Sequence, residues 1–316
     1  MSDPLLSIED LQISAGGKAV VEEVNLSIAP GEMVGLVGES GCGKSVTALS
    51  VLRLLAEPQI GVTGGRLIYD GTDLRTLPEK RMEAIRGDEI AMIFQEPMTS
   101  LNPVFTIGAQ MAESLRLHRR LSARAARDEA GALLARVGIP APQAALDRYP
   151  HEMSGGQRQR AMIAIALACG PRLLVADEPT TALDVTVQAQ ILDLLDGLRR
   201  ETGMAVLLIT HDLGVVSQYC DRVAVMYGGR IVEEAAAETL FAAPRHRYTE
   251  ALLATIPAAN APGAKLPAIP GLVPPPGQRP PGCAFAPRCR HVIERCRTEM
   301  PPLDGDAHKA RCWNPA

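Results

Sequence analysis

The stretch GESGCGKS occupies residues 38–45 and decides the fold. Its glycines, at 38, 41 and 43, leave the backbone bare, so that successive N–H groups can turn toward an anion and approach it closely. The apolar run MVGLV precedes it at 33–37, and VTALSVLRLL follows at 46–55 with helical spacing. We therefore expect the glycines between a buried strand and a helix N-terminus, a place that suits a phosphate group.

The same stretch matches G-x-x-x-x-G-K-[ST], the pattern of a phosphate-binding P-loop. In that pattern Lys44 reaches the outer phosphates of a nucleoside triphosphate, and the Ser45 hydroxyl holds magnesium. The rest of the loop would surround the phosphates, and its residues are Gly38, Glu39, Ser40, Gly41, Cys42 and Gly43. The alternative is a glycine turn that binds nothing, but the flanking strand and helix signals favour the P-loop. The motif alone does not say what the nucleotide's energy is used for.

Composition narrows the class of protein. The chain has 316 residues, of which 47% are apolar, which is enough for one large globular domain and an appendage. A formal net charge of −4 gives no overall basic field for nucleic acid, so we expect no nucleic-acid partner. The N-terminus MSDPLLSIED lacks a signal-peptide pattern, and the longest apolar run, at 161–170, is too short to cross a bilayer. We expect a cytosolic protein that docks on a membrane protein.

Strand and helix signals alternate along most of the chain, which predicts an α/β fold with a largely parallel sheet covered on both faces. Strand-like segments are followed, after about residue 90, by a helical stretch and then by a mixed region that ends in a hairpin. The expected strands are 5–14, 33–37, 65–71, 172–176 and 205–210, the helices 46–55 and 186–201, the helical stretch about 108–138, and the hairpin 222–234. After about 255 the composition shifts to proline and glycine, which predicts an irregular extension.

Two carboxylates follow the buried strand LLVA at 173–176. The carboxyl end of a buried strand beside a P-loop is where magnesium needs a second anchor and where an attacking water needs a base. We assign Asp177 to magnesium and Glu178 to the water. Acidic pairs at strand ends are often only turn formers, but this pair precedes PTTALD and follows a P-loop, which favours the catalytic reading.

A second anion site is predicted at HEMSGGQRQR, residues 151–160, where Ser154 is a natural N-cap for the helix that follows. This site has no lysine of its own, which suggests that it is shared with another chain. Residues 154–157 resemble the signature LSGGQ of ATP-binding cassette proteins, with Met153 in place of leucine.

The resemblance covers residues 1 to about 235, and its other motifs occur in the expected order. Gln95 matches the Q-loop, Asp184 the D-loop and His211 the switch histidine. The resemblance implies a P-loop ATPase of the cassette type with a helical subdomain at about 96–156. It implies Gln95, Glu178 and His211 as catalytic residues, and Ser45, Gln95 and Asp177 as magnesium ligands.

Cassette proteins close head to tail, so the resemblance also implies a dimer in which each ATP lies between two chains. The signature and D-loop residues would then serve a nucleotide at the dimer interface, and they are Ser154, Gly155, Gly156, Gln157 and Asp184. Cassette proteins commonly stack adenine on an aromatic residue where this chain has Ala15, so we expect weak base stacking.

Three segments narrow the family further: EPMTSLNPVFTIGAQMAE at 96–113, PRHRYTEALLATIP at 244–257 and GCAFAPRC at 282–289. They resemble the ATPase subunits of oligopeptide and dipeptide importers, although Arg247 replaces the proline that is usual in HPYT. We therefore expect an ATPase domain at 1–235 and a C-terminal extension at 236–316.

This resemblance implies that the chain powers bacterial peptide import from the cytoplasmic face of the cell membrane. The partners it implies are a second related ATPase, two membrane permeases and an extracytoplasmic peptide-binding protein. One alternative is a related importer with another cargo, such as nickel or glutathione. The other is a soluble cassette ATPase that acts on nucleic acid or ribosomes.

Four cysteines crowd into the last 34 residues with the spacing C-x5-C-x6-C-x15-C: Cys283, Cys289, Cys296 and Cys312. In a reducing cytosol such a cluster indicates a metal site before it indicates disulfides. Four thiolates could hold zinc or a 4Fe-4S cluster, and unligated thiols are a third possibility. Zinc sites usually have closer cysteine pairs, whereas the resemblance to peptide-importer ATPases implies 4Fe-4S. The site lies outside every ATP motif, so a structural or regulatory role is expected.

Overall fold

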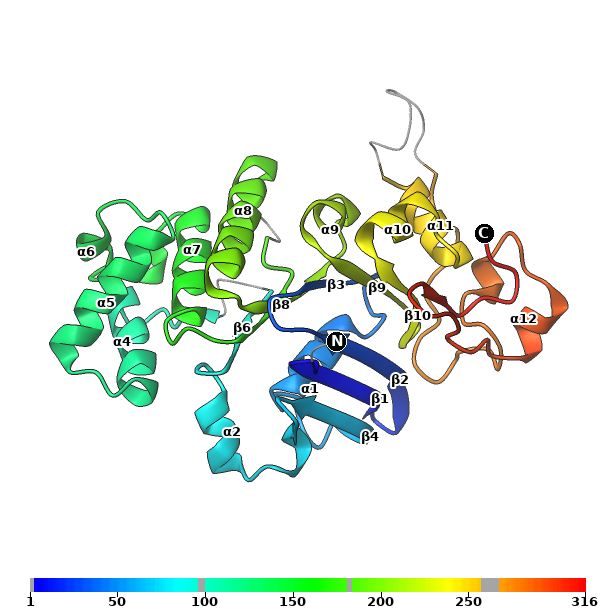
Figure 1. Ribbon diagram of the computed structural model, residues 1–316, viewed down its shortest axis with the longest axis horizontal. Coiled ribbons are helices and arrows are strands. Elements are labelled where there is room, and N and C mark those ends of the chain that lie inside the picture. The colour runs from blue at the N-terminus through cyan, green and yellow to red at the C-terminus, as the bar shows by residue number, and fades with distance from the viewer. Residues whose placement is uncertain (1–2, 96–99, 181–183, 257–266) are drawn as a thin grey trace. The chain divides into compact units, whose positions relative to one another are not determined.

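The computed structural model describes residues 3–95, 100–180, 184–256 and 267–316. The chain forms two compact units (Figure 1). The first unit is made of Met1–Thr76 and Leu208–Ala316, and the second of Leu77–Leu207. The domain boundary that the sequence suggests at 235 falls inside the first unit and stays a prediction.

The first unit contains an antiparallel sheet with the strand order β2-β1-β4-β5. Its strands are β1 (Leu6–Ala15), β2 (Lys18–Ile28), β4 (Ile60–Tyr69) and β5 (Thr72–Asp73). The sequence led us to expect a largely parallel sheet. For the strands expected at 5–14 and 65–71 that expectation is wrong, because they belong to this antiparallel sheet. Gly16 and Gly17, both with positive φ, form a two-residue turn between β1 and β2, and so short a connection can only join antiparallel strands.

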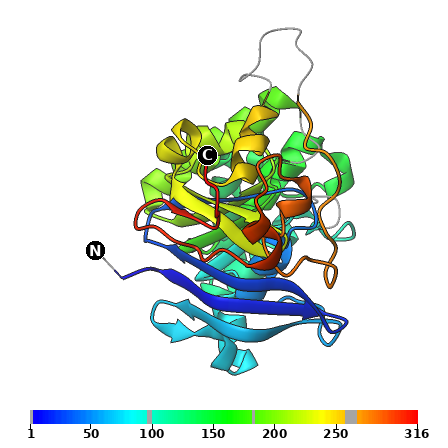
Figure 2. The same cartoon turned by 90° about the vertical axis from the view of Figure 1, so that its right-hand side faces the viewer.

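The same unit contains a second set of strands, in the order β11-β10-β9-β3. Strand β3 pairs in parallel with β9, whereas β9 with β10 and β10 with β11 are antiparallel. Every residue of β3 is buried, as expected for a strand covered on both faces. Strand β10 packs against β2 of the antiparallel sheet (Figure 2). The strands are β3 (Met33–Val37), β9 (Arg222–Tyr227), β10 (Arg230–Ala236) and β11 (Lys309–Ala310).

The other elements of the first unit are short. Helix α1 (Lys44–Val51) follows the P-loop, and the 3-10 helix η1 (Leu74–Thr76) follows β5. Helices α9 (Leu213–Tyr219), α10 (Ala237–Ala242) and α11 (Arg247–Ala254) flank the β9–β10 hairpin in sequence. Residues 267–316, the cysteine-bearing segment, are mostly irregular, as predicted, with only η4 (Ala286–Arg288), α12 (Glu294–Thr298) and β11.

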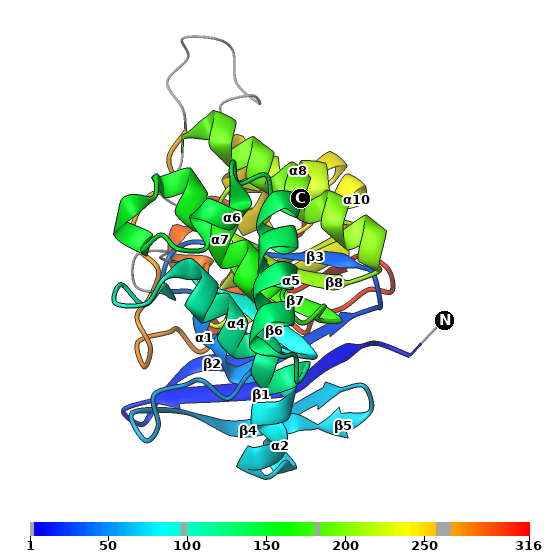
Figure 3. The same ribbon diagram turned by 90° about the vertical axis from the view of Figure 1, so that its left-hand side faces the viewer.

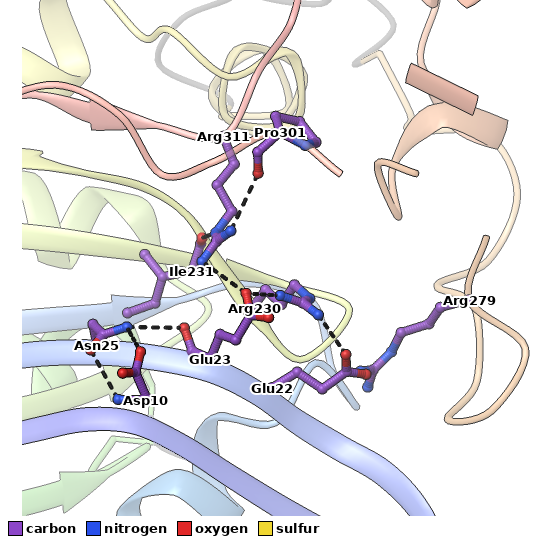
Figure 4. A network of polar contacts seen from close by, with 9 residues as sticks. All are labelled: Asp10, Glu22, Glu23, Asn25, Arg230, Ile231, Arg279, Pro301 and Arg311. Atoms are coloured by element: carbon purple, nitrogen blue, oxygen red, sulfur yellow. Dashed lines mark hydrogen bonds and ion pairs between the residues drawn. The ribbon is translucent and has the colours of Figure 1, made fainter. Parts of the chain in front are cut away.

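Arginines tie the cysteine-bearing segment to the rest of the first unit (Figure 4). Arg279 donates to Glu22 Oε1 on β2 at 2.6 Å, and Arg311 donates to the Ile231 carbonyl on β10 at 3.0 Å. Arg230 on β10 pairs with Glu22 at 2.6 Å and also with Glu23. The segment has few apolar residues of its own, so the polar contacts of Arg279 and Arg311 hold it where a larger domain would use a core.

The second unit combines parallel strands with helices (Figure 3). Strands β6 and β7 pair in parallel, and helices α4, α5 and α7 contact one another. The elements are α2 (Glu79–Ile85), β6 (Ile90–Ile93), α4 (Ile107–His118), α5 (Ala123–Arg136), α6 (Pro142–Ala145), η2 (Pro150–Glu152), α7 (Gly155–Ala166), β7 (Leu173–Asp177) and α8 (Val185–Thr202). Strand β8 (Ala205–Thr210) crosses the boundary between the units.

The helical stretch expected over about 108–138 contains two helices, α4 and α5. Ser122 caps α5 by accepting a hydrogen bond from Ala125 N at 3.3 Å, and Arg120 before it has a positive φ, which ends any continuous helix. The helical subdomain expected from 96 stays a prediction, and residues 96–99 lie outside the described residues. Within the described parts of the chain, no helix has the length and apolarity needed to cross a membrane.

Gly65 in β4 tests how tightly the antiparallel sheet is built. Its φ is +84°, and a Cβ there would lie 2.5 Å from the carbonyl oxygens of Glu9 and Asp10. Gly71 has a similar φ of +76° but nothing within 4 Å, so it is a matched control. We expect Gly71→Ala to cost about 1–2 kcal/mol of unfolding free energy, and Gly65→Ala about 1–3 kcal/mol more because of overpacking. Urea denaturation measures both, and equal losses would contradict the close packing.

Candidate functional site

The P-loop lies in the first unit between β3 and α1, as the sequence predicts. Gly38, Gly41 and Gly43 have φ values of +152°, +79° and +111°, which side chains rarely adopt. A Cβ on Gly38 would lie 2.2 Å from the Met226 carbonyl oxygen, so the loop packs directly on the backbone of β9. These glycines give the loop its shape, and Gly43 is the N-cap residue of α1.

Lys44 lies within its own loop and is only 6% exposed. Its Nζ donates to the carbonyl oxygens of Gly38 at 2.8 Å and Glu39 at 3.1 Å. The Cys42 thiol is 3.7 Å from Nζ, and burial raises the pKa of that thiol despite the ammonium group. The lysine thus spans the loop and would have to leave these carbonyl oxygens to reach a phosphate.

Glu39 connects the P-loop to the C-terminal extension. Its N–H donates to the Tyr248 hydroxyl of α11 at 2.9 Å, and its Oε2 accepts from Arg288 Nη1 at 2.8 Å. Tyr248 is fully buried and Arg288 is 8% exposed. Burial alone would lower the pKa of Arg288, but hydrogen bonds to Glu39 and Tyr227 raise it, so this guanidinium stays charged. Sequence reasoning missed both partners of Glu39.

The strand-end carboxylates lie in the second unit. Asp177 ends β7 and is 4% exposed, and Glu178 follows with a φ of +48°. A glutamate with this backbone conformation is strained, which is typical of functional positions. Gln95 Nε2 donates to Glu178 Oε2 at 3.1 Å, so the structure brings together two of the predicted catalytic residues.

The predicted signature lies at the start of α7, also in the second unit. Ser154 Oγ accepts from Gln157 N at 3.3 Å, and Gln157 Oε1 accepts from Ser154 N at 3.2 Å, which makes a capping box. Ser154 and Gly155 are exposed, and Gly156 is half-buried. The cap predicted from the sequence is therefore confirmed, and the end of α7 presents backbone N–H groups near two glycines.

Gln159 is a residue of the second unit that the sequence reading passed over. It is 1% exposed, and its Nε2 donates to the carbonyl oxygen of Pro179, the residue after Glu178. This bond fixes α7 to the backbone beside the strand-end carboxylates. The only sequence signal was a second glutamine two positions after Gln157.

The remaining predicted residues are at element ends. Asp184 caps α8 by accepting from Val187 N at 3.0 Å, and residues 181–183 before it lie outside the described residues. His211 is exposed between β8 and α9 in the first unit. Ala15 ends β1 opposite Lys18 and Ile60. The phosphate-loop residues and His211 thus lie in one unit, and Gln95, Asp177, Glu178, Asp184 and the signature in the other.

The four cysteines of the cysteine-bearing segment line one cavity. His246, Phe285 and Trp313 contribute to the same lining. Burial raises the pKa of the Cys283 thiol to about 11 and also raises those of Cys289 and Cys312, so these thiols are protonated near neutral pH. Among the described residues, no group of three or more His, Cys, Asp or Glu side chains is placed to hold a single metal ion.

Comparison with known families identifies two regions. Residues 21–181 match the family model for ABC transporters, and residues 232–296 match the model for the C-terminal region of oligopeptide/dipeptide transporters. The two matches leave the antiparallel sheet's first strand and the last cysteine outside, but together they cover the P-loop, the strand-end carboxylates and the start of the cysteine-bearing segment.

Similar proteins extend over nearly the whole chain. A probable peptide ABC transporter ATP-binding protein of Sinorhizobium fredii is 52% identical over 319 aligned positions, which cover 99% of this chain and 95% of that protein. A putative peptide import ATP-binding protein of Brucella abortus is 53% identical over 314 positions, which cover 98% and 94%.

Solved structures agree with these similarities. The ATP-binding cassette MJ0796, in a dimeric post-hydrolysis state with ADP and Pi, has a TM-score of 0.66 at 28% identity and covers 73% of this chain and 98% of that one. CbiO1 from Clostridium perfringens, part of the ABC transporter complex cbiONQ, has a TM-score of 0.66 at 27% identity and covers 76% and 92%. The chain therefore belongs to the ABC transporter family.

Proposed function

We propose that this chain is the ATP-hydrolysing subunit of an importer of peptides. The observation that carries the proposal is the similarity of 52–53% over at least 98% of the chain to proteins named as peptide transporter or peptide import ATP-binding proteins. The match of residues 232–296 to the oligopeptide/dipeptide transporter C-terminal region supports the same cargo class.

The P-loop binds the phosphates of ATP in this proposal. The glycine-bearing backbone from Gly38 to Ser45 offers N–H groups, and Lys44 moves from the carbonyl oxygens of its own loop to the outer phosphates. Magnesium would enter the site together with ATP. The hydroxyl of Ser45, the amide oxygen of Gln95 and the carboxylate of Asp177 are hard oxygen ligands that suit this ion.

Glu178 is the general base in this proposal. Its carboxylate accepts the proton of the water that attacks the γ-phosphate, and Gln95, which hydrogen-bonds it at 3.1 Å, orients the carboxylate. His211 is the remaining catalytic side chain and would contact the γ-phosphate.

The start of α7 would serve a nucleotide held by another chain. The exposed N-terminus of α7, with Ser154, Gly155, Gly156 and Gln157, favours an anion but has no lysine. The dimeric state of MJ0796 supports a cassette dimer here too. Asp184 would lie at the same interface. We propose a second related ATPase subunit as the partner.

The importer would contain further subunits. Peptide transport across a membrane needs spanning segments, and no helix in the described residues of this chain can span one. We propose two membrane permeases and an extracytoplasmic peptide-binding protein, with this chain held peripherally on the cytoplasmic face of the bacterial cell membrane. The net charge of −4 argues against a nucleic-acid partner.

We also propose a 4Fe-4S cluster on Cys283, Cys289, Cys296 and Cys312. All four thiols line one cavity, and all are free of disulfides. They do not converge on the point that a single ion would occupy. What supports the cluster is the donor set, because a 4Fe-4S cluster is held by four cysteine thiolates and four cysteines line this cavity. Bound there, it would cross-link a segment that has little apolar core.

Glu178→Gln tests the proposed base. The amide keeps the hydrogen-bonding shape but cannot take a proton, so ATP hydrolysis by the assembled transporter should fall by roughly 10²-fold or more while ATP still binds. Glu201→Gln is the matched control, because Glu201 is an exposed carboxylate of the same unit that pairs with Arg136. Hydrolysis by Glu178→Gln within a few-fold of wild type would refute the assignment.

Uptake of radiolabelled peptides tests the function. Cells that lack this chain should lose uptake of di- or oligopeptides, wild-type protein should restore it, and Glu178→Gln should not, because transport needs hydrolysis. Nickel and glutathione uptake are measured in the same strains. If only one of those two is lost, the cargo assignment is wrong although the ATPase assignment stands.

Metal analysis of anaerobically purified protein tests the cluster. We expect a brown protein with about four irons per chain, and Cys289→Ser and Cys312→Ser should lose both the colour and the iron. Cys169→Ser is the control, because Cys169 is a buried cysteine of the second unit whose thiol contacts the Ser114 carbonyl oxygen. One zinc per chain, or no metal at all, would overturn the proposal.

A further inference from the structure

Glu39 places a carboxylate in the phosphate-binding loop, where negative charge is unfavourable for binding ATP. The Glu39 side chain is 28% exposed, so water screens its charge only in part. Its Oε1 is buried and has no hydrogen-bond partner among the described residues. The charge must therefore be balanced by a neighbouring group if the loop is to hold a triphosphate.

Arg288 supplies that balance. Its Nη1 is 2.8 Å from Glu39 Oε2 and 3.2 Å from the Tyr227 hydroxyl, and its guanidinium lies 5.8 Å from the centre of the Tyr227 ring. Two carbonyl oxygens of the cysteine-bearing segment, those of Pro270 at 2.8 Å and Ile269 at 3.3 Å, accept its other N–H groups. The guanidinium is thus held by the segment and aimed at the P-loop.

Tyr248 holds the same residue from a second direction. Its hydroxyl accepts the Glu39 N–H at 2.9 Å, while Lys44 donates to the Glu39 carbonyl oxygen at 3.1 Å. The backbone N–H, the backbone carbonyl and the carboxylate of Glu39 are therefore all engaged. Two of the partners, Tyr248 and Arg288, come from the C-terminal extension, so this end of the loop is also held from outside the ATPase motifs.

An aromatic cluster fixes the positions of Tyr248 and Arg288 relative to the cysteines. The ring centres of Tyr227 and Tyr248 are 4.5 Å apart, and Phe285 is 5.3 Å from each of them. Phe285 and Arg288 both lie between Cys283 and Cys289, and η4 ends at Arg288 directly before Cys289. The loop between these two cysteines therefore carries the aromatic ring and the arginine that reach the P-loop together.

We propose that Arg288 and Tyr248 are positioning residues of the ATP site, through which the C-terminal extension neutralises and fixes Glu39 and so sets the affinity of the P-loop for ATP. The proposal rests on ATP binding by the P-loop, but it is independent of the cargo and of the metal.

Arg288→Ala in the full-length chain tests the proposal by direct binding of a fluorescent ATP analogue. Loss of the guanidinium leaves a partly buried, unpaired carboxylate in the phosphate-binding loop, so Kd should rise about tenfold. In the assembled ATPase, KM for ATP should rise by a similar factor with kcat nearly unchanged at saturating ATP. Salt should reduce the difference between variant and wild type, because it screens the exposed charge.

The double variant Glu39→Gln with Arg288→Ala separates charge from structure. Removing the carboxylate as well should bring Kd back to within about threefold of Glu39→Gln alone, because no unpaired charge remains. Arg288→Lys should keep part of the affinity, since it keeps the positive charge but loses the forked geometry. Tyr248→Phe, which keeps the ring packing, should raise Kd by about threefold.

Arg311→Ala is the matched control. Arg311 is also 8% exposed, also precedes a cysteine of the cavity, and also binds carbonyl oxygens, those of Ile231 and Pro301 (Figure 4). Among the described residues, Arg311 contacts Ile231, Pro301 and Glu23 and no P-loop residue, so ATP affinity should be unchanged. Thermal unfolding of each variant shows whether the extension remains folded.

Two results would overturn the proposal. One is wild-type ATP affinity in Arg288→Ala. The other is an equal loss of affinity in Arg288→Ala and Arg311→Ala with no recovery in the double variant, which would mean that the extension supports the fold only in a general way. If Arg288→Ala does not fold, the comparison of Arg288→Lys with Glu39→Gln decides the question. Peptide uptake has no part in these measurements, so a wrong cargo assignment would leave them unchanged.

Discussion

The absence of a side chain at Gly38 is the constraint on which the first unit depends. A Cβ there would lie 2.2 Å from the Met226 carbonyl oxygen, so only glycine lets the P-loop rest on the backbone of β9. The neighbouring turn extends the contact, because Gly229 N donates to the Cys42 carbonyl oxygen and Glu22 N donates to the Gly229 carbonyl oxygen. The phosphate loop, the β9–β10 hairpin and the antiparallel sheet are thereby joined through backbone groups, which side-chain changes elsewhere cannot easily shift.

Buried charged groups hold the C-terminal extension in place, as a hydrophobic core would in a larger domain. Glu233 on β10 is fully buried, and its carboxylate accepts the N–H groups of Arg245 at 2.6 Å and His246 at 2.8 Å, at the start of α11. Burial lowers the pKa of His246 to about 3, so this ring stays neutral beside the cysteine cavity. Removing one partner from such a set is costly, because it leaves a buried charge unpaired. The position of Tyr248, and through it the position of Glu39, follows from this arrangement.

In the second unit, several polar side chains meet at the end of β7. Glu178 adopts a conformation that glutamate rarely takes, Gln95 hydrogen-bonds its carboxylate, and Gln159 holds the next carbonyl oxygen. A side chain held from several sides keeps a strained backbone from relaxing. Asp184 and Ser154 both act as helix caps, so residues that the sequence predicts for the D-loop and the signature also stabilise helices of this chain.

The sequence alone determined the features that depend on local patterns. It predicted β3 with its exact bounds, β7 to within a residue, the β9–β10 hairpin, the P-loop and the Ser154 cap, because apolar runs, glycines and capping side chains act over a few residues. It missed the break at 119–122 between α4 and α5, although Ser122 was a local signal. The resemblance of its motifs also placed the chain in its family.

Only the tertiary structure decided which distant residues meet. Arg288 and Glu39 are 249 positions apart, and Arg279 and Glu22 are 257 apart, and no periodicity or motif links such residues. That the four cysteines line one cavity, and that the loop between the first two of them carries an arginine to the P-loop, follows from the packing of the aromatic cluster and the buried charges. Side-chain contacts of this kind depend on the path of the whole chain, and local sequence does not encode that path in a form that can be read one segment at a time.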